Sequence, residues 1–104
     1  MSKNIITLSV HVGDVAICYS NENIDEVLEI LQNMMKICVN RLLFLDVSRL
    51  KTILEVVSVC GAQLEKFEKD SYGVNLTLSS DSQDVINVIK EIFSQDELVI
   101  VNEK

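Results

Sequence analysis

The segment RLLFLDV, residues 41–47, restricts the fold more than any other part of this sequence because it is an almost continuous apolar run. Such a run predicts a central strand buried on both faces, as in sheets that helices cover on either side. Asp46 stands where this strand is expected to end. It is either a residue that begins a turn or a contact residue at the carboxyl edge of the sheet.

The next segment, residues 52–69, has two interpretations. Gly61 favours a short helix followed by a strand, whereas the apolar spacing favours one long helix. Apolar residues recur at intervals of four, three, four and three: Ile53, Val57, Cys60, Leu64 and Phe67. In a strand, Leu64 and Phe67 would point to opposite faces. A glycine inside a helix costs roughly 1 kcal/mol relative to alanine. Burial of these five apolar side chains contributes more than that. We therefore predict one helix with Thr52 as its N-cap.

The start of the chain alternates between apolar and polar residues, which is typical of a strand with one buried face. The apolar positions are Ile6, Leu8, Val10 and Val12. Gly13 and Asp14 then favour a turn, and VAICY follows as a second apolar segment. The pattern predicts a β-hairpin over residues 5–19.

Apolar residues at helical spacing predict a first helix over residues 24–38. Alternation in VNLTLS predicts a strand that begins near Val74. Ser80 with Gln83 predicts the start of a third helix, and ELVIV predicts a last strand. The resulting order is β-β-α-β-α-β-α-β. It predicts a single α/β domain over residues 1–104, with helices packed over a mixed, mostly parallel sheet.

The composition limits the classes of partner. The formal net charge of −7, from 16 acidic and 9 basic residues, opposes binding to a nucleic-acid backbone and is compatible with a basic protein partner. The N-terminal residues lack a signal-peptide pattern, and no apolar run approaches the length of a membrane span. We therefore expect a cytoplasmic protein that does not insert into membranes.

Three segments together resemble the STAS domain, the module named for sulfate transporters and anti-sigma-factor antagonists. HVGDVAICYS resembles the opening hairpin of that family, NRLLFLDVSRL its central strand, and GVNLTLSSDSQDVINVIKEIF its fourth strand and third helix. The resemblance implies a non-enzymatic regulatory protein that acts by docking to a protein partner. The implied partners are a switch kinase of the anti-sigma type or the ATPase of a lipid-transport ABC system, and a homodimer is compatible with it.

The resemblance also implies a contact surface at the join between strand and helix. Its residues are Asp46, Ser48, Arg49, Lys51 and Thr52. Thr52 takes the place of the hydroxyl residue that is phosphorylated in one branch of the family, and Ser48 is the second candidate. The neighbouring sequence SRLKTILE lacks the Asp and Gly of the family's usual sequence, and an ordinary N-cap is the structural alternative for Thr52.

The sequence contains no pattern that predicts an enzyme. The one histidine, His11, lies on the polar side of the first strand, and its spacing from Cys18, Cys38 and Cys60 is not that of a zinc site. The glycines form no phosphate-binding loop, so we expect neither a metal nor a cofactor.

An alternative function comes from the acidic face of the first helix. The acidic residues Asp25, Glu26 and Glu29 are typical of a solvated helix face, but they also suit an acidic immunity protein or antitoxin that inhibits a basic nuclease or toxin.

Overall fold

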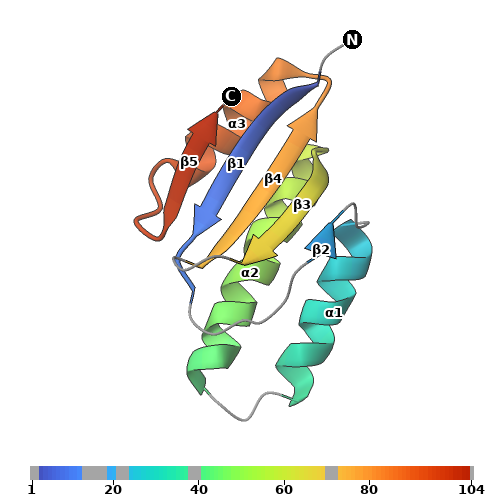
Figure 1. Cartoon of the computed structure of the whole chain (residues 1–104), viewed down its shortest axis with the longest axis vertical. Helices are drawn as coiled ribbons and strands as arrows, with labels where there is room; N and C mark the ends of the chain where they lie inside the picture. The colour runs from blue at the N-terminus through green and yellow to red at the C-terminus, as the bar shows by residue number, and fades with distance from the viewer. Residues whose placement is uncertain (1–2, 13–18, 21–23, 38–40, 70–72, 104) are drawn as a thin grey trace.

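The computed structural model describes residues 3–12, 19–20, 24–37, 41–69 and 73–103 (Figure 1). Its elements are β1 (Asn4–Val10), β2 (Tyr19–Ser20), α1 (Ile24–Ile37), α2 (Arg41–Cys60), β3 (Gln63–Lys69), β4 (Val74–Ser80), α3 (Gln83–Phe93) and β5 (Val99–Glu103). The predictions of β1, α1, β4, α3 and β5 are confirmed, with small shifts in their ends. Strict alternation and helical spacing specified these elements locally.

The strands form one sheet in the order β2-β3-β4-β1-β5, in which every neighbouring pair is antiparallel. The predicted mostly parallel sheet is therefore wrong, and so is the fold that the STAS resemblance implied. The four long strands with α2 and α3 follow the split β-α-β order, the ferredoxin-like topology. β2 and α1 are inserted between β1 and α2.

The predicted hairpin over residues 5–19 is wrong in its pairing. β1 lies between β4 and β5, so both of its edges are already occupied. The short β2 pairs instead with β3, where Tyr19 lies opposite Phe67. The predicted turn at Gly13 and Asp14 lies outside the described residues.

The predicted central strand over residues 41–47 is the first part of α2. Leucine and arginine are good helix formers, and the run contains one β-branched residue, Val47. Four residues spaced by three, four and three positions are completely buried: Val47, Leu50, Leu54 and Val57. This stripe attaches a helix, not a strand, to the sheet.

The predicted helix over residues 52–69 is also wrong, because α2 ends at Cys60. Gly61 has a φ of +86°, its N–H donates to the Ser58 carbonyl at 3.1 Å, and the Ala62 N–H donates to the Val57 carbonyl at 3.3 Å. This pair of bonds is the Schellman arrangement that ends helices at glycine. β3 begins two residues later.

An irregularity in the β3–β4 pairing explains the misleading spacing of Leu64 and Phe67. The register shifts between Leu64 and Lys66, so that one additional residue separates the two buried positions. Leu64 and Phe67 are therefore both buried, although a regular strand would place them on opposite faces.

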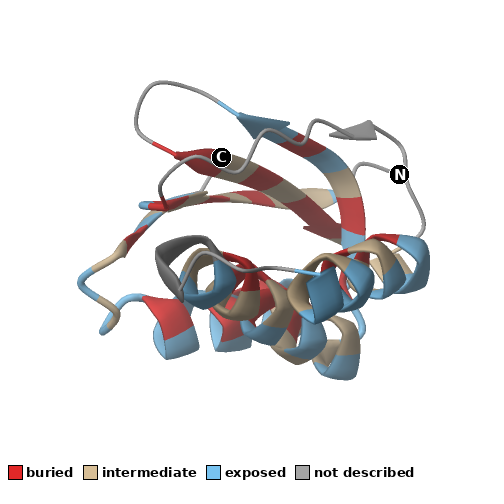
Figure 2. Ribbon diagram, turned by 90° about the horizontal axis from the view of Figure 1, so that it is seen from below, coloured by how far each residue is buried: buried red, intermediate tan, exposed pale blue. Residues whose placement is uncertain are grey.

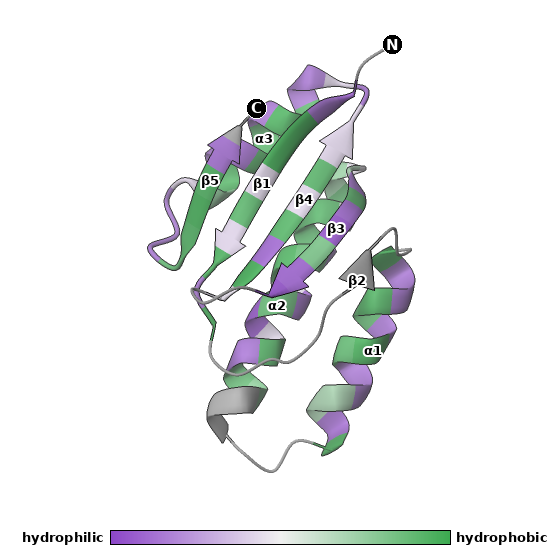
Figure 3. Cartoon of the chain, viewed as in Figure 1, coloured by the Kyte–Doolittle hydropathy of each residue, from purple (hydrophilic) through white to green (hydrophobic). Residues whose placement is uncertain are grey.

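The molecule has two layers, with the three helices on one face of the sheet (Figure 2). The core lies between the layers, and β1 contributes Ile6, Leu8 and Val10 to it. The other face carries polar residues, so the strands alternate in hydropathy along their length (Figure 3). Beyond the sheet, α1 and α2 extend side by side as a helical pair (Figure 1). Within the described ranges, no helix has the length and apolar character needed to cross a membrane.

Candidate docking groove

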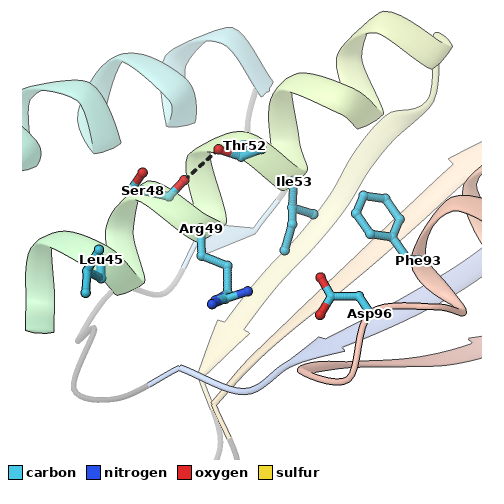
Figure 4. A pocket seen from close by; sticks show the side chains of 7 residues that line it. All are labelled: Leu45, Ser48, Arg49, Thr52, Ile53, Phe93 and Asp96. Carbon is cyan, nitrogen blue, oxygen red and sulfur yellow. Dashed lines mark hydrogen bonds between the residues drawn. The ribbon is translucent and has the colours of Figure 1, made fainter.

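A surface groove of about 400 Å³ lies between α2 and the C-terminal end of α3. We call it the α2–α3 groove (Figure 4); its lining residues are Leu45, Ser48, Arg49, Thr52, Ile53, Phe93 and Asp96. Three residues of the predicted contact surface, Ser48, Arg49 and Thr52, are among them. They share this groove because positions separated by three or four residues lie on one side of a helix.

The groove has an apolar base and an apolar rim. Ile53 and Phe93 are buried in the core, whereas the Leu45 side chain is 52% exposed. A partner side chain placed over Leu45 would remove this apolar area from water.

Two opposite charges face one another across the groove. The Arg49 guanidinium extends from α2, and the Asp96 carboxylate extends from the connection between α3 and β5 (Figure 4). No ion pair joins these two side chains in the part of the chain that the structure describes. The groove therefore presents a cation and an anion to a ligand over an apolar base.

Asp96 is held in place by its own connection. Its Oδ1 accepts a hydrogen bond from the Leu98 N–H at 2.9 Å, and its carbonyl accepts one from the Val99 N–H at 3.2 Å. Its own N–H donates to the Phe93 carbonyl at 3.2 Å. These bonds fix the carboxylate relative to the end of α3, which gives this wall of the groove a defined shape.

Thr52 is not an N-cap, contrary to the prediction. It lies inside α2, is exposed, and its hydroxyl donates to the Ser48 carbonyl at 2.9 Å. This bond is the common internal hydrogen bond of a helical threonine to the residue four positions earlier. Phosphorylation of Thr52 or Ser48 stays a prediction, but its argument from a helix N-terminus is lost.

The other two predicted contact residues do not line the groove. Asp46 lies within α2 and not at the end of a strand. Lys51 forms a 3.0 Å ion pair with Glu55 on the same helix. The structure therefore brings together three of the five residues and separates Asp46 and Lys51 from them.

The sequence reasoning missed four residues of the groove: Leu45, Ile53, Phe93 and Asp96. Reading α2 as continuous would have placed Leu45, Arg49 and Thr52 on one side of a helix, at spacings of four and three. No local pattern brings Asp96 near α2, because that approach depends on how α3 packs on the sheet.

A polar cluster lies at the start of β1 and β3. Glu65 accepts a hydrogen bond from the buried Ser79 hydroxyl at 2.5 Å, and Lys3 lies 3.5 Å from the Glu65 carboxylate and donates to Gln63 at 2.8 Å. The Ser79 hydrogen bond, opposed by partial burial and aided by Lys3, lowers the pKa of Glu65 below its usual value. This cluster connects β3 to β4 and to the residue before β1, and two of its residues, Lys3 and Gln63, line a smaller hollow of about 170 Å³.

The face of the sheet opposite the helices has a shallow polar depression of about 480 Å³. Its lining residues are Thr7, Ser9, Lys66, Glu68, Asn75, Thr77 and Asn102. The Ser9 hydroxyl donates to Asn75 Oδ1 at 2.7 Å, so a side-chain hydrogen bond joins β1 to β4 on this face. The lining contains no aromatic residue on which a nucleic-acid base could stack.

The described residues contain no group of three or more side chains that could hold a metal ion. Cys60 is a free, partly exposed cysteine, and Cys18 and Cys38 lie outside the described residues.

Comparison with protein-family models found no match, and no curated protein or solved structure matched significantly. The resemblance to the STAS domain therefore rests on short segments alone.

Proposed function

We propose that this chain is a non-enzymatic regulatory protein that acts by docking a protein partner in the α2–α3 groove. One observation carries the proposal: Arg49 and Asp96 face one another over a base of Ile53 and Phe93, beside the exposed Leu45. A partner side chain that covers Leu45 would bury apolar area, which is the main favourable contribution in most associations. The antiparallel sheet is not the fold that the STAS resemblance implied, so the two partner classes implied by that resemblance are not part of the proposal.

Arg49 specifies the chemistry of the partner more narrowly than the apolar base does. A guanidinium binds carboxylates through two parallel hydrogen bonds, which add orientation as well as free energy. The partner segment is therefore one that places an apolar side chain over the base of the groove, an acidic residue beside Arg49 and a basic residue beside Asp96. A cytoplasmic location is part of the proposal; the free Cys60 is consistent with a reducing compartment.

The test compares two charge reversals on the same helix. A partner captured from the native host is purified, and its affinity is measured by titration calorimetry for wild type, Arg49→Glu and Lys51→Glu. We expect Arg49→Glu to weaken binding by about tenfold or more, as removal of a charge-assisted hydrogen bond does. Lys51 lies outside the groove, so Lys51→Glu is the matched control and should change affinity less than about twofold. Equal effects of the two variants would contradict the site.

A second candidate function rests on the exposure of the acidic residues of α1. Asp25, Glu26 and Glu29 are all exposed, at the N-terminal half of the helix. We propose as the alternative that this face binds a basic nuclease or toxin, as an acidic inhibitor does. Neutralising all three (Asp25→Asn, Glu26→Gln, Glu29→Gln) should slow association strongly and reduce its salt dependence. Under the groove proposal the same triple variant binds the partner normally.

A further inference from the structure

β5 is an edge strand whose hydrogen-bonding groups can be assigned residue by residue. It pairs with β1 in a register in which Val10 lies opposite Val99 and Leu8 lies opposite Val101. The His11 N–H donates to the Leu98 carbonyl at 2.7 Å, one position beyond this ladder. Hydrogen-bonded pairs alternate in antiparallel sheets, so Ile100 and Asn102, like the Leu98 carbonyl, direct their backbone groups toward β1.

The backbone groups of Val99, Val101 and Glu103 consequently point away from β1, toward the open edge. The Val99 N–H agrees with this assignment, because it donates to the Asp96 carbonyl at 3.2 Å and not to β1. The groups left on the edge are the N–H and carbonyl of Val101, the N–H and carbonyl of Glu103 and the carbonyl of Val99. In the described residues no further strand pairs with this edge.

The opposite edge of the sheet is protected by several features. β3 is mostly hydrophilic (Figure 3), its register is irregular between Leu64 and Lys66, and β2 covers part of it. Charges, irregular pairing and covering segments are the usual means by which proteins prevent pairing at an edge. β5 begins with VIV and has a regular register with β1. The two edges therefore differ, and only the β5 edge is suited to accept another strand.

We infer that the β5 edge binds a second copy of this chain through antiparallel β5–β5 pairing about a two-fold axis at Val101. The register follows from the available groups. With Val101 opposite Val101 of the second copy, each Val101 N–H donates to the other Val101 carbonyl, and each Glu103 N–H donates to the other Val99 carbonyl. Four of the five open groups are used, and the Glu103 carbonyl stays unpaired because the Val99 N–H keeps its bond to Asp96.

The occupant is a second copy because the edge is complementary to itself. In an interface on a two-fold axis every contact occurs twice, and here the four groups used form two such symmetric pairs of bonds. The same register keeps helices on one face of a continuous sheet, with the partly buried Val101 side chains next to each other on the helix side. On the other face, Ile100, which is 47% exposed, lies opposite Asn102 of the second copy.

Charge makes this dimer dependent on ionic strength. Each copy carries a formal net charge of −7, so the two copies repel each other at low salt. Screening at higher salt reduces that repulsion, and we expect the dissociation constant to fall as salt rises. A positively charged peptide bound at the same edge would instead bind more weakly as salt rises.

The experiment uses amide hydrogen exchange measured by NMR at low and high protein concentration. The N–H groups of Ile100 and Asn102 should be protected at both concentrations, because they bond to β1. Those of Val101 and Glu103 should be protected only at high concentration. Rapid exchange at Val101 and Glu103 at millimolar protein and high salt would overturn the inference.

Two substitutions at one position test the backbone directly. Val101→Pro removes the outward N–H without removing a bond to β1, whereas Val101→Thr keeps both the shape and the N–H. Analytical ultracentrifugation should show dimerisation weakened roughly 30-fold by Val101→Pro, the equivalent of two lost backbone hydrogen bonds, and little changed by Val101→Thr.

A dimer that survives Val101→Pro, or one that Arg49→Glu abolishes, would place the interface elsewhere and overturn the inference. If Val101→Pro fails to fold, Glu103→Pro removes the other outward N–H near the end of the strand and makes the same prediction. The inference does not rest on the groove proposal, because the two surfaces share no residue.

Discussion

Leu64 of β3 lies directly opposite Leu78 of β4, and both side chains are buried. Residues opposite one another in neighbouring strands are the unit from which a sheet gains its stability. The chain passes from the end of α2 to the start of β3 through only two residues, Gly61 and Ala62. The left-handed conformation of Gly61 therefore determines both where α2 stops and where β3 enters the sheet.

Gly61→Ala should destabilise the protein by about 1–2 kcal/mol, because alanine is strained in the left-handed conformation. No neighbouring atom would contact the added methyl group, so the effect is one of backbone strain alone. A continuous helix through residue 61 would give the opposite sign, a gain of roughly 1 kcal/mol. Urea unfolding of the two proteins distinguishes the outcomes by sign.

Thr52→Ala should raise the free energy of unfolding by up to about 0.5 kcal/mol. Thr52 is exposed inside α2, where alanine has the higher helix propensity. At an N-cap the same substitution would instead cost about 1 kcal/mol. Thermal unfolding followed by circular dichroism measures the difference, and a loss of stability would contradict the position of Thr52 in the helix.

Leu50→Ala and Leu45→Ala form a matched pair on α2. Leu50 is completely buried, and its truncation should cost about 2–5 kcal/mol. Truncation of the half-exposed Leu45 should lower the free energy of unfolding by less than about 0.5 kcal/mol, apart from the change in helix propensity. Denaturant titration of both variants tests this, and a large loss at Leu45 would show that the groove is part of the core.

Ser79→Ala should raise the pKa of Glu65 toward 4.5, its usual value, because the hydrogen bond from Ser79 is the largest cause of the lowered pKa. NMR titration of the Glu65 carboxyl carbon measures the shift. Lys3→Gln is the control, since Lys3 contributes less than Ser79, and should produce a smaller change.

The same interaction predicts a pH dependence of stability. A carboxyl whose pKa is lowered in the folded state stabilises the protein above its unfolded pKa, and this contribution is lost as pH falls through the folded pKa. The advantage of wild type over Ser79→Ala should therefore shrink on acidification below about pH 4.5. Solvent screens the interaction, because the Glu65 side chain is 37% exposed, so the change is small.

The sequence alone determined the elements whose periodicity has one interpretation. Alternation specified β1 and β4, and helical spacing specified α1 and α3, because in each the buried face follows from the local pattern. It also singled out Ser48, Arg49 and Thr52, although the reason given for Thr52 was wrong.

Only the tertiary structure decided what residues 41–69 form. Two stripes with the same spacing compete there, one ending at Val57 and one continuing through Gly61 to Phe67. The sheet selects the first, because β3 pairs with β4 and the irregular register allows Leu64 and Phe67 to be buried together. Strand pairing joins residues far apart in the chain, and so does the groove between Arg49 and Asp96. Local spacing contains no information about such partners, which is why the fold and the site required the three-dimensional structure.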